Sequence, residues 1–141
     1  MNSISLRRAR ALIDAALAES ARQGFKPMGI VVVDAAAQVV ASVREDGATA
    51  LRLDIALGKA AAAVGMGASS RVLTQRAKDL PAFFGALAAA SQQKFIPQTG
   101  AVLVKAADGT VIGAAGASGG TGDEDEQIVI AGIVAAGLTH G

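Results

Sequence analysis

Four short runs of β-branched and small apolar residues, arranged in two pairs, most constrain how this chain can fold. The pairs cover residues 29–34 with 38–44 and residues 101–105 with 110–118. Only a short link separates the members of each pair, which favours antiparallel hairpins over parallel crossovers. The second link contains Asp108 and Gly109, a dipeptide that strongly favours a hairpin turn. The first link has no glycine.

Segments with helical periodicity surround these hairpins. Apolar residues recur at helical spacing in a first segment that Ser5 can cap and Gly24 can end, and later segments also favour helix. We expect helices over residues 6–23, 50–64, 70–78 and 123–139. Residues 80–91 are ambiguous, because Pro81 can begin either a turn or a helix. The resulting order predicts an α+β domain with an antiparallel sheet sandwiched by helices.

Length and composition indicate a single domain that associates with copies of itself. The 141 residues suit one domain over 1–141, and 52% of them are hydrophobic. We expect part of this apolar surface to be buried between subunits of a homo-oligomer. The longest uncharged runs, 80–93 and 127–139, are shorter than the roughly 18 residues of a membrane span. No secretory signal is apparent, so a cytoplasmic location is expected.

The composition disfavours several classes of function. A net charge of +1 and the absence of Trp and Tyr argue against nucleic-acid binding. The absence of cysteine excludes disulfides and thiolate sites. The only histidine, His140, lies beside the C-terminus, so we reject a zinc site, a Ser-His-Asp triad and a His-ligated haem. The acids at 123–126 suit the start of a helix better than a cation site, and no metal site is predicted.

A glycine-rich segment is the first candidate binding element. Residues 116–121 read GASGGT and connect a predicted strand to a predicted helix. Backbone N–H groups at such a junction can bind an anion, although the glycines can equally serve a tight turn. The candidate ligand-binding residues here are Gly116, Ser118, Gly119, Gly120 and Thr121.

Three charged residues are further candidates. Lys59 lies in an alanine-rich helix, where it can be a buried base, a carboxylate clamp or a side chain that snorkels to solvent. Arg44 and Asp46 flank a predicted strand end. Arg44 can hold a carboxylate and Asp46 can accept a proton, or both can simply belong to a surface turn.

Three stretches of sequence resemble one family as a set. VVVDAAAQVVASVREDGA at 31–48 is similar to VDxxGxLVAxxRMDGA, and LDIALGKAAAAVGMGASS at 53–70 is similar to DIAxGKAxTAxxFxxPT. VIGAAGASGGTGDEDE at 111–126 is similar to IGAIGVSGGTxEQDE. These patterns are those of the GlcG/HbpS-like family, which includes the C-terminal domain of PduO-type proteins. The resemblance spans nearly the whole chain.

The resemblance implies more than the residues alone do. It implies a profilin-like α/β/α sandwich with a sheet of five antiparallel strands, the fifth expected near 94–98, and homo-oligomers. Some members of the family bind haem. Three departures stand out: alanines follow Asp34 in place of glycines, Glu45 replaces a methionine, and KFIPQTG at 94–100 replaces a glycine-rich segment. The last change affects a segment that often helps to form the pocket.

These observations lead to one principal hypothesis and two alternatives. The principal hypothesis is a pocket formed by Arg44, Lys59 and the 116–121 loop that binds a carboxylated small molecule or haem. Haem would then need Lys, Met, Thr or water as its iron ligand. The first alternative is a cofactor-independent isomerase or lyase of organic-acid catabolism that uses Lys59 or Asp46 as acid or base. The second is an oligomer without a ligand.

Overall fold

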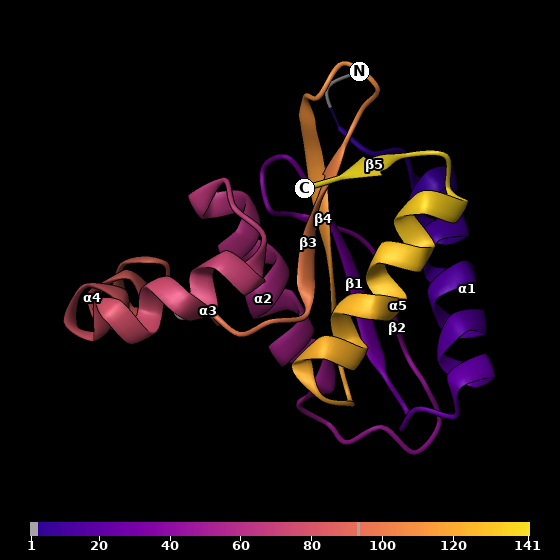
Figure 1. Ribbon diagram of the computed structural model, residues 1–141, viewed down its shortest axis with the longest axis horizontal. Coiled ribbons are helices and arrows are strands. Elements are labelled where there is room, and N and C mark those ends of the chain that lie inside the picture. The colour runs from indigo at the N-terminus through magenta and orange to yellow at the C-terminus, as the bar shows by residue number, and fades with distance from the viewer. Residues whose placement is uncertain (1–2, 93) are drawn as a thin grey trace.

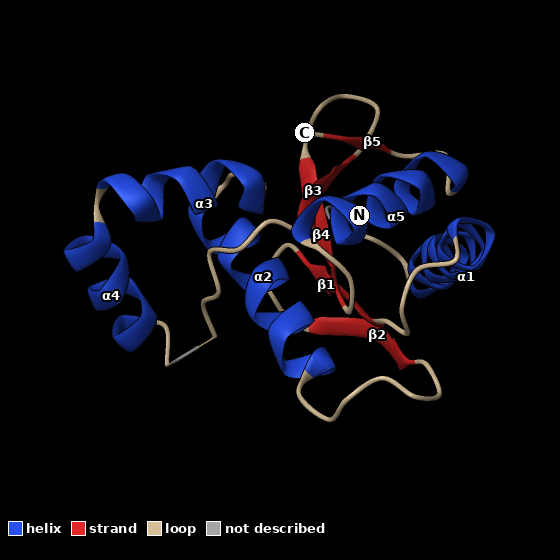
Figure 2. Ribbon diagram, turned by 60° about the horizontal axis from the view of Figure 1, so that its bottom comes forward, coloured by secondary structure: helices blue, strands red, loops and turns tan. Residues whose placement is uncertain are grey.

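A five-stranded antiparallel sheet with helices on both faces forms the body of the molecule (Figures 1 and 2). The computed structural model describes residues 3–92 and 94–141. The strands are β1 Gly29–Asp34, β2 Val39–Arg44, β3 Ala101–Lys105, β4 Val111–Ser118 and β5 Thr139–His140, in the order β2-β1-β4-β3-β5. The helices are α1 Leu6–Gln23, α2 Arg52–Met66, α3 Ser70–Asp79, α4 Pro81–Ala90 and α5 Gly122–Ala135. The predicted α+β sandwich is confirmed.

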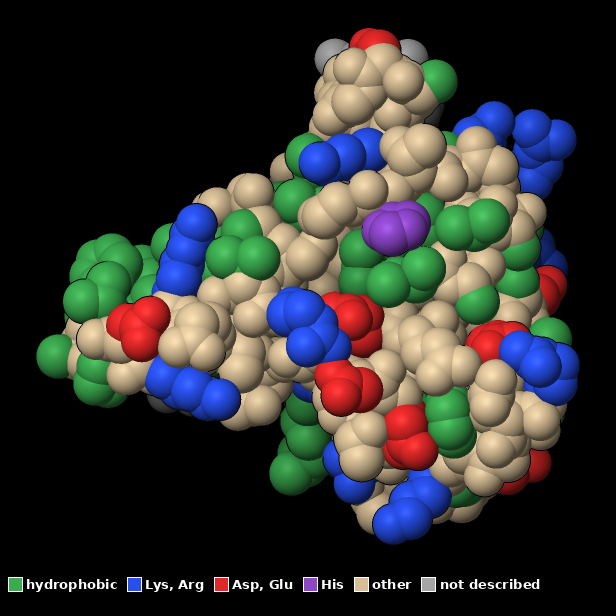
Figure 3. Space-filling view, in the orientation of Figure 1, with side chains coloured by type: hydrophobic (Ala, Val, Ile, Leu, Met, Phe, Trp, Pro, Cys, Tyr) green, Lys and Arg blue, Asp and Glu red, His purple; other side chains and the backbone are tan. Residues whose placement is uncertain are grey.

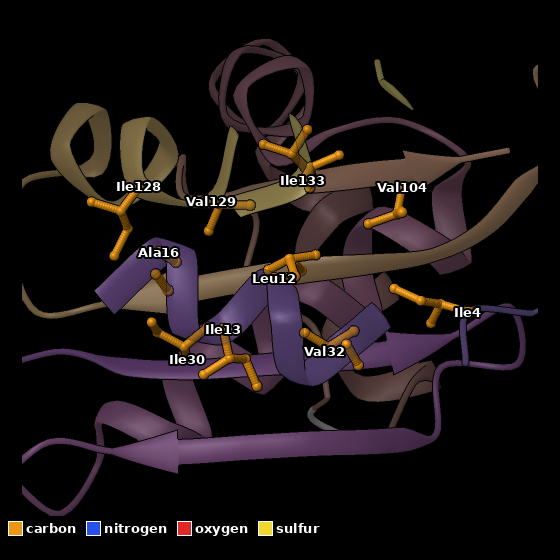
Figure 4. Packing of buried hydrophobic residues seen from close by; sticks show 14 of the residues in the cluster. Ile4, Leu12, Ile13, Ala16, Ile30, Val32, Val104, Ile128, Val129 and Ile133 are labelled. Atoms are coloured by element: carbon orange, nitrogen blue, oxygen red, sulfur yellow. The ribbon is translucent and has the colours of Figure 1, made fainter. Parts of the chain in front are cut away.

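The two hairpins join through pairing between β1 and β4, which places four strands in one sheet. Successive side chains of β1 therefore face opposite layers. Ile30 and Val32 pack against α1 and α5, as Figure 4 shows, whereas Val31 and Val33 pack against α2. These side chains are at most 2% exposed. Each contributes roughly 1.5–3 kcal/mol through burial, so this central strand anchors both cores.

The link between β1 and β2 turns without the glycine that such turns favour. Ala37 takes the left-handed conformation, with φ 62°. The Asp34 carboxylate accepts hydrogen bonds from the N–H groups of Ala36, at 2.9 Å, and Gln38, at 3.0 Å. These local bonds offset the strain that a non-glycine residue has in this conformation.

The fifth strand is not where the sequence led us to expect it. Residues 94–98 form no strand, and the predicted last helix ends at Ala135 instead of near Thr139. Gly137 takes φ 76° and redirects the chain, and the buried side chain of Leu138 anchors the new direction. The chain then pairs its last strand, β5, with β3. The prediction near 94–98 was therefore wrong, because that segment bonds to α2 instead of to a strand: the Ile96 N–H donates to the carbonyl oxygen of Gly58 at 3.1 Å.

Helices α3 and α4 form an arm that projects from the body (Figures 1 and 2). The ambiguous segment 80–91 is helical over most of its length. Phe84 is 5% exposed and packs against Phe95, with ring centroids 5.8 Å apart, whereas Phe83 is 53% exposed. Figure 3 shows hydrophobic side chains gathered at the end of this arm. Neither α4 nor any other helix in the described ranges is long and apolar enough to cross a membrane.

Candidate functional site

Helix α2 lies unusually close to β4, and this contact positions Lys59. A Cβ on Gly116 would lie 2.5 Å from the carbonyl oxygen of Ala56 and 3.3 Å from the Cβ of Ala60. Only a glycine in the strand and small residues on the helix permit that distance. Gly116 is therefore required by the packing of α2 on the sheet, whatever else it does.

Lys59 is buried and its ammonium has specific partners. The side chain extends to Asp125 Oδ2 and to the carbonyl oxygen of Ala117, each 3.0 Å from Nζ. Gly100 closes the other side, since a Cβ there would lie 2.7 Å from Nζ. Lys59 is only 5% exposed, which excludes the alternative that it snorkels to solvent. The ammonium belongs to a buried ion pair.

Asp125 connects this lysine to the glycine-rich bend. Its Oδ1 accepts a hydrogen bond from the Gly120 N–H at 2.9 Å, while Oδ2 contacts Lys59. Burial raises the pKa of Asp125 above its ordinary value, although the Lys59 ammonium and the Gly120 N–H act in the opposite direction. The lysine and the bend thus lie close together, but a carboxylate of the chain itself joins them, and the shared ligand pocket stays a prediction.

The bend already uses part of its hydrogen-bonding capacity within the chain. Thr121 caps α5: its Oγ1 accepts from the Glu124 N–H at 3.2 Å, and its own N–H donates to Glu124 Oε1 at 2.9 Å. A Cβ on Gly119 would lie 2.3 Å from the carbonyl oxygen of Pro27. The glycines and the threonine therefore have structural roles here, and anion binding by this loop stays a prediction.

Ser118 lies at the end of the sheet in a row with Arg44. The register pairs Gly29 with Arg44 on β2 and with Ser118 on β4, so the three residues face the same side. Arg44 is exposed and donates from Nη1 to the carbonyl oxygen of Ala48 at 2.7 Å. Asp46 is exposed on the following turn. The structure thus brings Arg44 and Ser118 to the same end of the sheet, and the Lys59 ammonium bonds to the carbonyl oxygen of Ala117, the residue before Ser118.

Arg52 lies at this same end of the sheet, and sequence reasoning missed it. The sequence suggests only a charge on the solvated face of a helix, but Arg52 is half-buried and donates from Nη1 to Ser118 Oγ at 3.2 Å. The two residues are 66 positions apart in the sequence. The missing side chain of Gly29 leaves the space that Arg52 occupies, and that glycine was the available signal.

A hollow on the surface lies elsewhere, between α1 and the outer strand β2. Its volume is about 440 Å³, which falls within the usual range for small-molecule sites. Apolar walls combine here with one cation, from Arg10, and one carboxylate, from Asp14. The lining residues are Leu6, Arg10, Ile13, Asp14, Val40, Ala41, Ser42 and Val43. No sequence pattern indicated this hollow, because α1 and β2 meet only in the folded chain.

The chain belongs to the HbpS-like family. The family described as "Haem degrading protein HbpS-like" matches residues 4–134, which is nearly all of the chain. The resemblance seen in the sequence is thereby confirmed. No curated protein sequence matches the chain.

Solved structures of similar fold agree with this assignment. The PduOC:heme complex is 26% identical and covers 97% of both chains, with a TM-score of 0.86. Klebsiella pneumoniae protein ORFY is 25% identical over 95% of this chain and 90% of its own, with a TM-score of 0.85. A double mutant of Streptomyces reticuli HbpS is 26% identical over 94% and 86%, with a TM-score of 0.81.

Proposed function

We propose that this protein binds haem in the hollow between α1 and β2. The observation that carries the proposal is the hollow itself, whose volume lies within the range of small-molecule sites and which combines apolar side chains with a cation for a propionate. The HbpS-like family and the likeness to the PduOC:heme complex support haem as the ligand. In its less specific form, the proposal is that the hollow binds a small carboxylated molecule.

The residues of the hollow fit haem in a particular way. Leu6, Ile13 and Val43 offer apolar surface to the porphyrin, and the Arg10 guanidinium suits a propionate. Among the side chains that line the hollow, the Asp14 carboxylate could serve as an oxygen ligand to the iron. When bound, haem supplies an iron centre that binds small ligands and changes oxidation state.

His140 is badly placed to ligate iron in this hollow. It lies on β5, at the opposite edge of the sheet from β2. A single chain therefore offers only oxygen ligands or water at the proposed site. We expect a weakly ligated haem, in keeping with the rejection of a His-ligated haem from the sequence.

A haem titration followed by Soret absorption tests the proposal. The wild type should show saturable binding, and Ala41→Phe should abolish it because the larger side chain fills the hollow from the sheet. Ala50→Phe, on an exposed loop, serves as the matched control and should bind as the wild type does. Circular dichroism checks that each variant folds. Full binding by Ala41→Phe, with loss in Arg44→Gln, would instead favour the site predicted from the sequence.

That sequence-based site, formed by Arg44, Lys59 and the 116–121 loop, remains the alternative location. A ligand that reached the Lys59 ammonium would have to displace Asp125, which is 2% exposed. The hypothesis of an isomerase or lyase using Lys59 or Asp46 likewise stays a prediction. The buried ion pair gives it no support, since a paired lysine is a poor general base.

We also propose that the protein assembles from copies of itself in the cytoplasm. The exposed apolar side chains on the projecting arm support the first part of this proposal. They are Val72, Leu80 and Phe83. Apolar surface of this kind is commonly covered in oligomers. The cytoplasmic location rests only on the sequence.

A further inference from the structure

Another hollow lies where the segment before α1 runs beside the hairpin of β3 and β4 (Figure 1). The Ile4 N–H donates to the carbonyl oxygen of Ile112 at 2.9 Å, which holds this segment against β4. The volume of the hollow is about 240 Å³. Sites for drug-sized ligands usually have roughly 300–1,000 Å³, so this hollow suits a much smaller molecule than a porphyrin.

The floor of this hollow is apolar and firmly packed. It consists of Ile4, Ile112 and Leu138, which are 4%, 6% and 7% exposed and belong to the core shared by α1 and α5. Because these side chains pack within that core, the shape of the floor does not depend on mobile groups. Such a floor favours the hydrocarbon part of a ligand.

Two serine hydroxyls line the hollow, and both have a proton to donate. Ser5 Oγ accepts a hydrogen bond from the Arg8 N–H at 3.2 Å, and Ser3 Oγ accepts from the Ala35 N–H at 3.5 Å. A serine hydroxyl can also donate one hydrogen bond, and within the described residues neither proton has an acceptor. Both hydroxyls are therefore available to an acceptor group of a ligand.

Arg8 adds a positive charge to the lining of the hollow. Its guanidinium forms no ion pair within residues 3–92 and 94–141. The carboxylate of Asp108, on the adjoining hairpin turn, accepts from the Thr110 N–H at 2.9 Å. Of the described residues that line the hollow, none is acidic. An unpaired guanidinium beside two hydroxyl donors complements an anion, above all a carboxylate, which it binds bidentately.

We infer that this hollow binds a short-chain aliphatic monocarboxylic acid. The carboxylate lies at Arg8 and the two serine hydroxyls, and the hydrocarbon chain covers the apolar floor. The inference does not rest on the haem proposal, since this hollow and the one between α1 and β2 share no lining residue.

A nuclear magnetic resonance titration with hexanoate locates the ligand and measures its affinity. Saturable shifts should centre on the amides of Ile4, Ile112 and Leu138. From acetate to hexanoate, each added methylene should tighten binding roughly fourfold, because it is buried on the apolar floor. Hexanol has the same chain without the charge and should bind about tenfold more weakly than hexanoate.

Variants separate the charge from the hollow. Arg8→Gln should weaken hexanoate binding about tenfold and remove the preference over hexanol. Arg7→Gln is the matched control, since Arg7 is the preceding exposed residue of α1 and does not line the hollow. Ala106→Phe should abolish binding because the larger side chain fills the hollow. Ala41→Phe, in the hollow proposed for haem, should leave hexanoate binding unchanged, and circular dichroism checks that each variant folds.

Four results would overturn the inference. They are an absence of saturable shifts, shifts centred away from the three floor residues, equal binding by the wild type and Arg8→Gln, and equal binding of hexanoate and hexanol. Inorganic phosphate that bound as tightly as hexanoate would also overturn it, because the apolar floor would then contribute nothing.

Discussion

At the scale of single residues, Asp125 connects more of the candidate region than any residue singled out in the sequence. One carboxylate bonds to the Lys59 ammonium through Oδ2 and to the Gly120 N–H through Oδ1. Both ends of the pair are buried. A buried charge that loses its partner is strongly unfavourable, whereas loss of both charges together is far better tolerated.

Replacing Lys59 should therefore destabilise the fold much more than replacing the whole pair. We expect Lys59→Met to lower the free energy of unfolding by about 3–5 kcal/mol, and the double variant Lys59→Met/Asp125→Leu to recover most of that loss. Urea denaturation measures both. Arg22→Gln, which removes an exposed ion pair with Glu19, should change stability far less than Lys59→Met does. Additive losses in the double variant would contradict the pairing.

The raised pKa of Asp125 leads to a second prediction, on how the stability contributed by this pair depends on pH. The folded state holds the Asp125 proton more tightly than the unfolded state does, so this group contributes most to stability at low pH. Its contribution falls as the pH rises from the ordinary value of 3.8 through the raised value in the folded protein. Without Lys59 the pKa should rise further.

The destabilisation by Lys59→Met should consequently grow as the pH rises. Urea denaturation of the wild type and the variant at several pH values between about 4 and 8 measures the difference. Glu19 and Asp108, whose pKa values are lowered, affect both proteins equally and cancel in the comparison. A difference that is the same at every pH would show that the carboxylate does not respond to the lysine.

At the scale of elements, the position of α2 depends on glycines in the strands beneath it. Gly29 and Gly116 both lie where a Cβ would meet the backbone of this helix. The alanines on the facing side of α2 complete the contact and are buried. The composition that looked merely small and apolar in the sequence is thus what allows the helix to approach the sheet.

Gly116→Ala should displace α2 and lower the free energy of unfolding by about 1–3 kcal/mol, because a new methyl group would meet the Ala56 carbonyl oxygen. Gly65→Ala, on α2 itself, is the matched control, since nothing lies within 4 Å of the added methyl group. It should be neutral or stabilise by up to about 1 kcal/mol. Thermal or urea unfolding distinguishes them, and an equal effect of both changes would contradict the close contact.

Local patterns predicted most elements, and contacts between distant residues decided the rest. The β-branched runs and the Asp108–Gly109 turn were sufficient for both hairpins. The sequence could not indicate which acid between 123 and 126 turns inward, because each suits the start of a helix. Arg52 and Ser118 meet only through the pairing of β1 with β4, and β5 is too short to leave a periodic signal.

At the scale of the whole molecule, the arm formed by α3 and α4 has apolar side chains that packing within a single chain leaves exposed. It exposes Phe83 and Leu80 to solvent, away from both cores. The candidate ligand sites lie on the body. We therefore expect the arm to serve assembly and the body to serve ligand binding.

Phe83→Asp should reduce the molar mass measured by light scattering, because a charge would disrupt contacts between arms. Val134→Asp, at an exposed apolar position on α5, is the control and should leave the mass unchanged. The outcome that would contradict the proposal is a monomeric wild type, or a change in mass only with the control.

The most direct test of the account maps haem onto the chain by nuclear magnetic resonance. Paramagnetic haem broadens the signals of nuclei near the iron, so the affected amides report where it binds. Our account predicts broadening along α1 and β2, centred on Leu6, Ile13 and Ala41. Broadening confined to residues 116–121, or none at a saturating haem concentration, would contradict it.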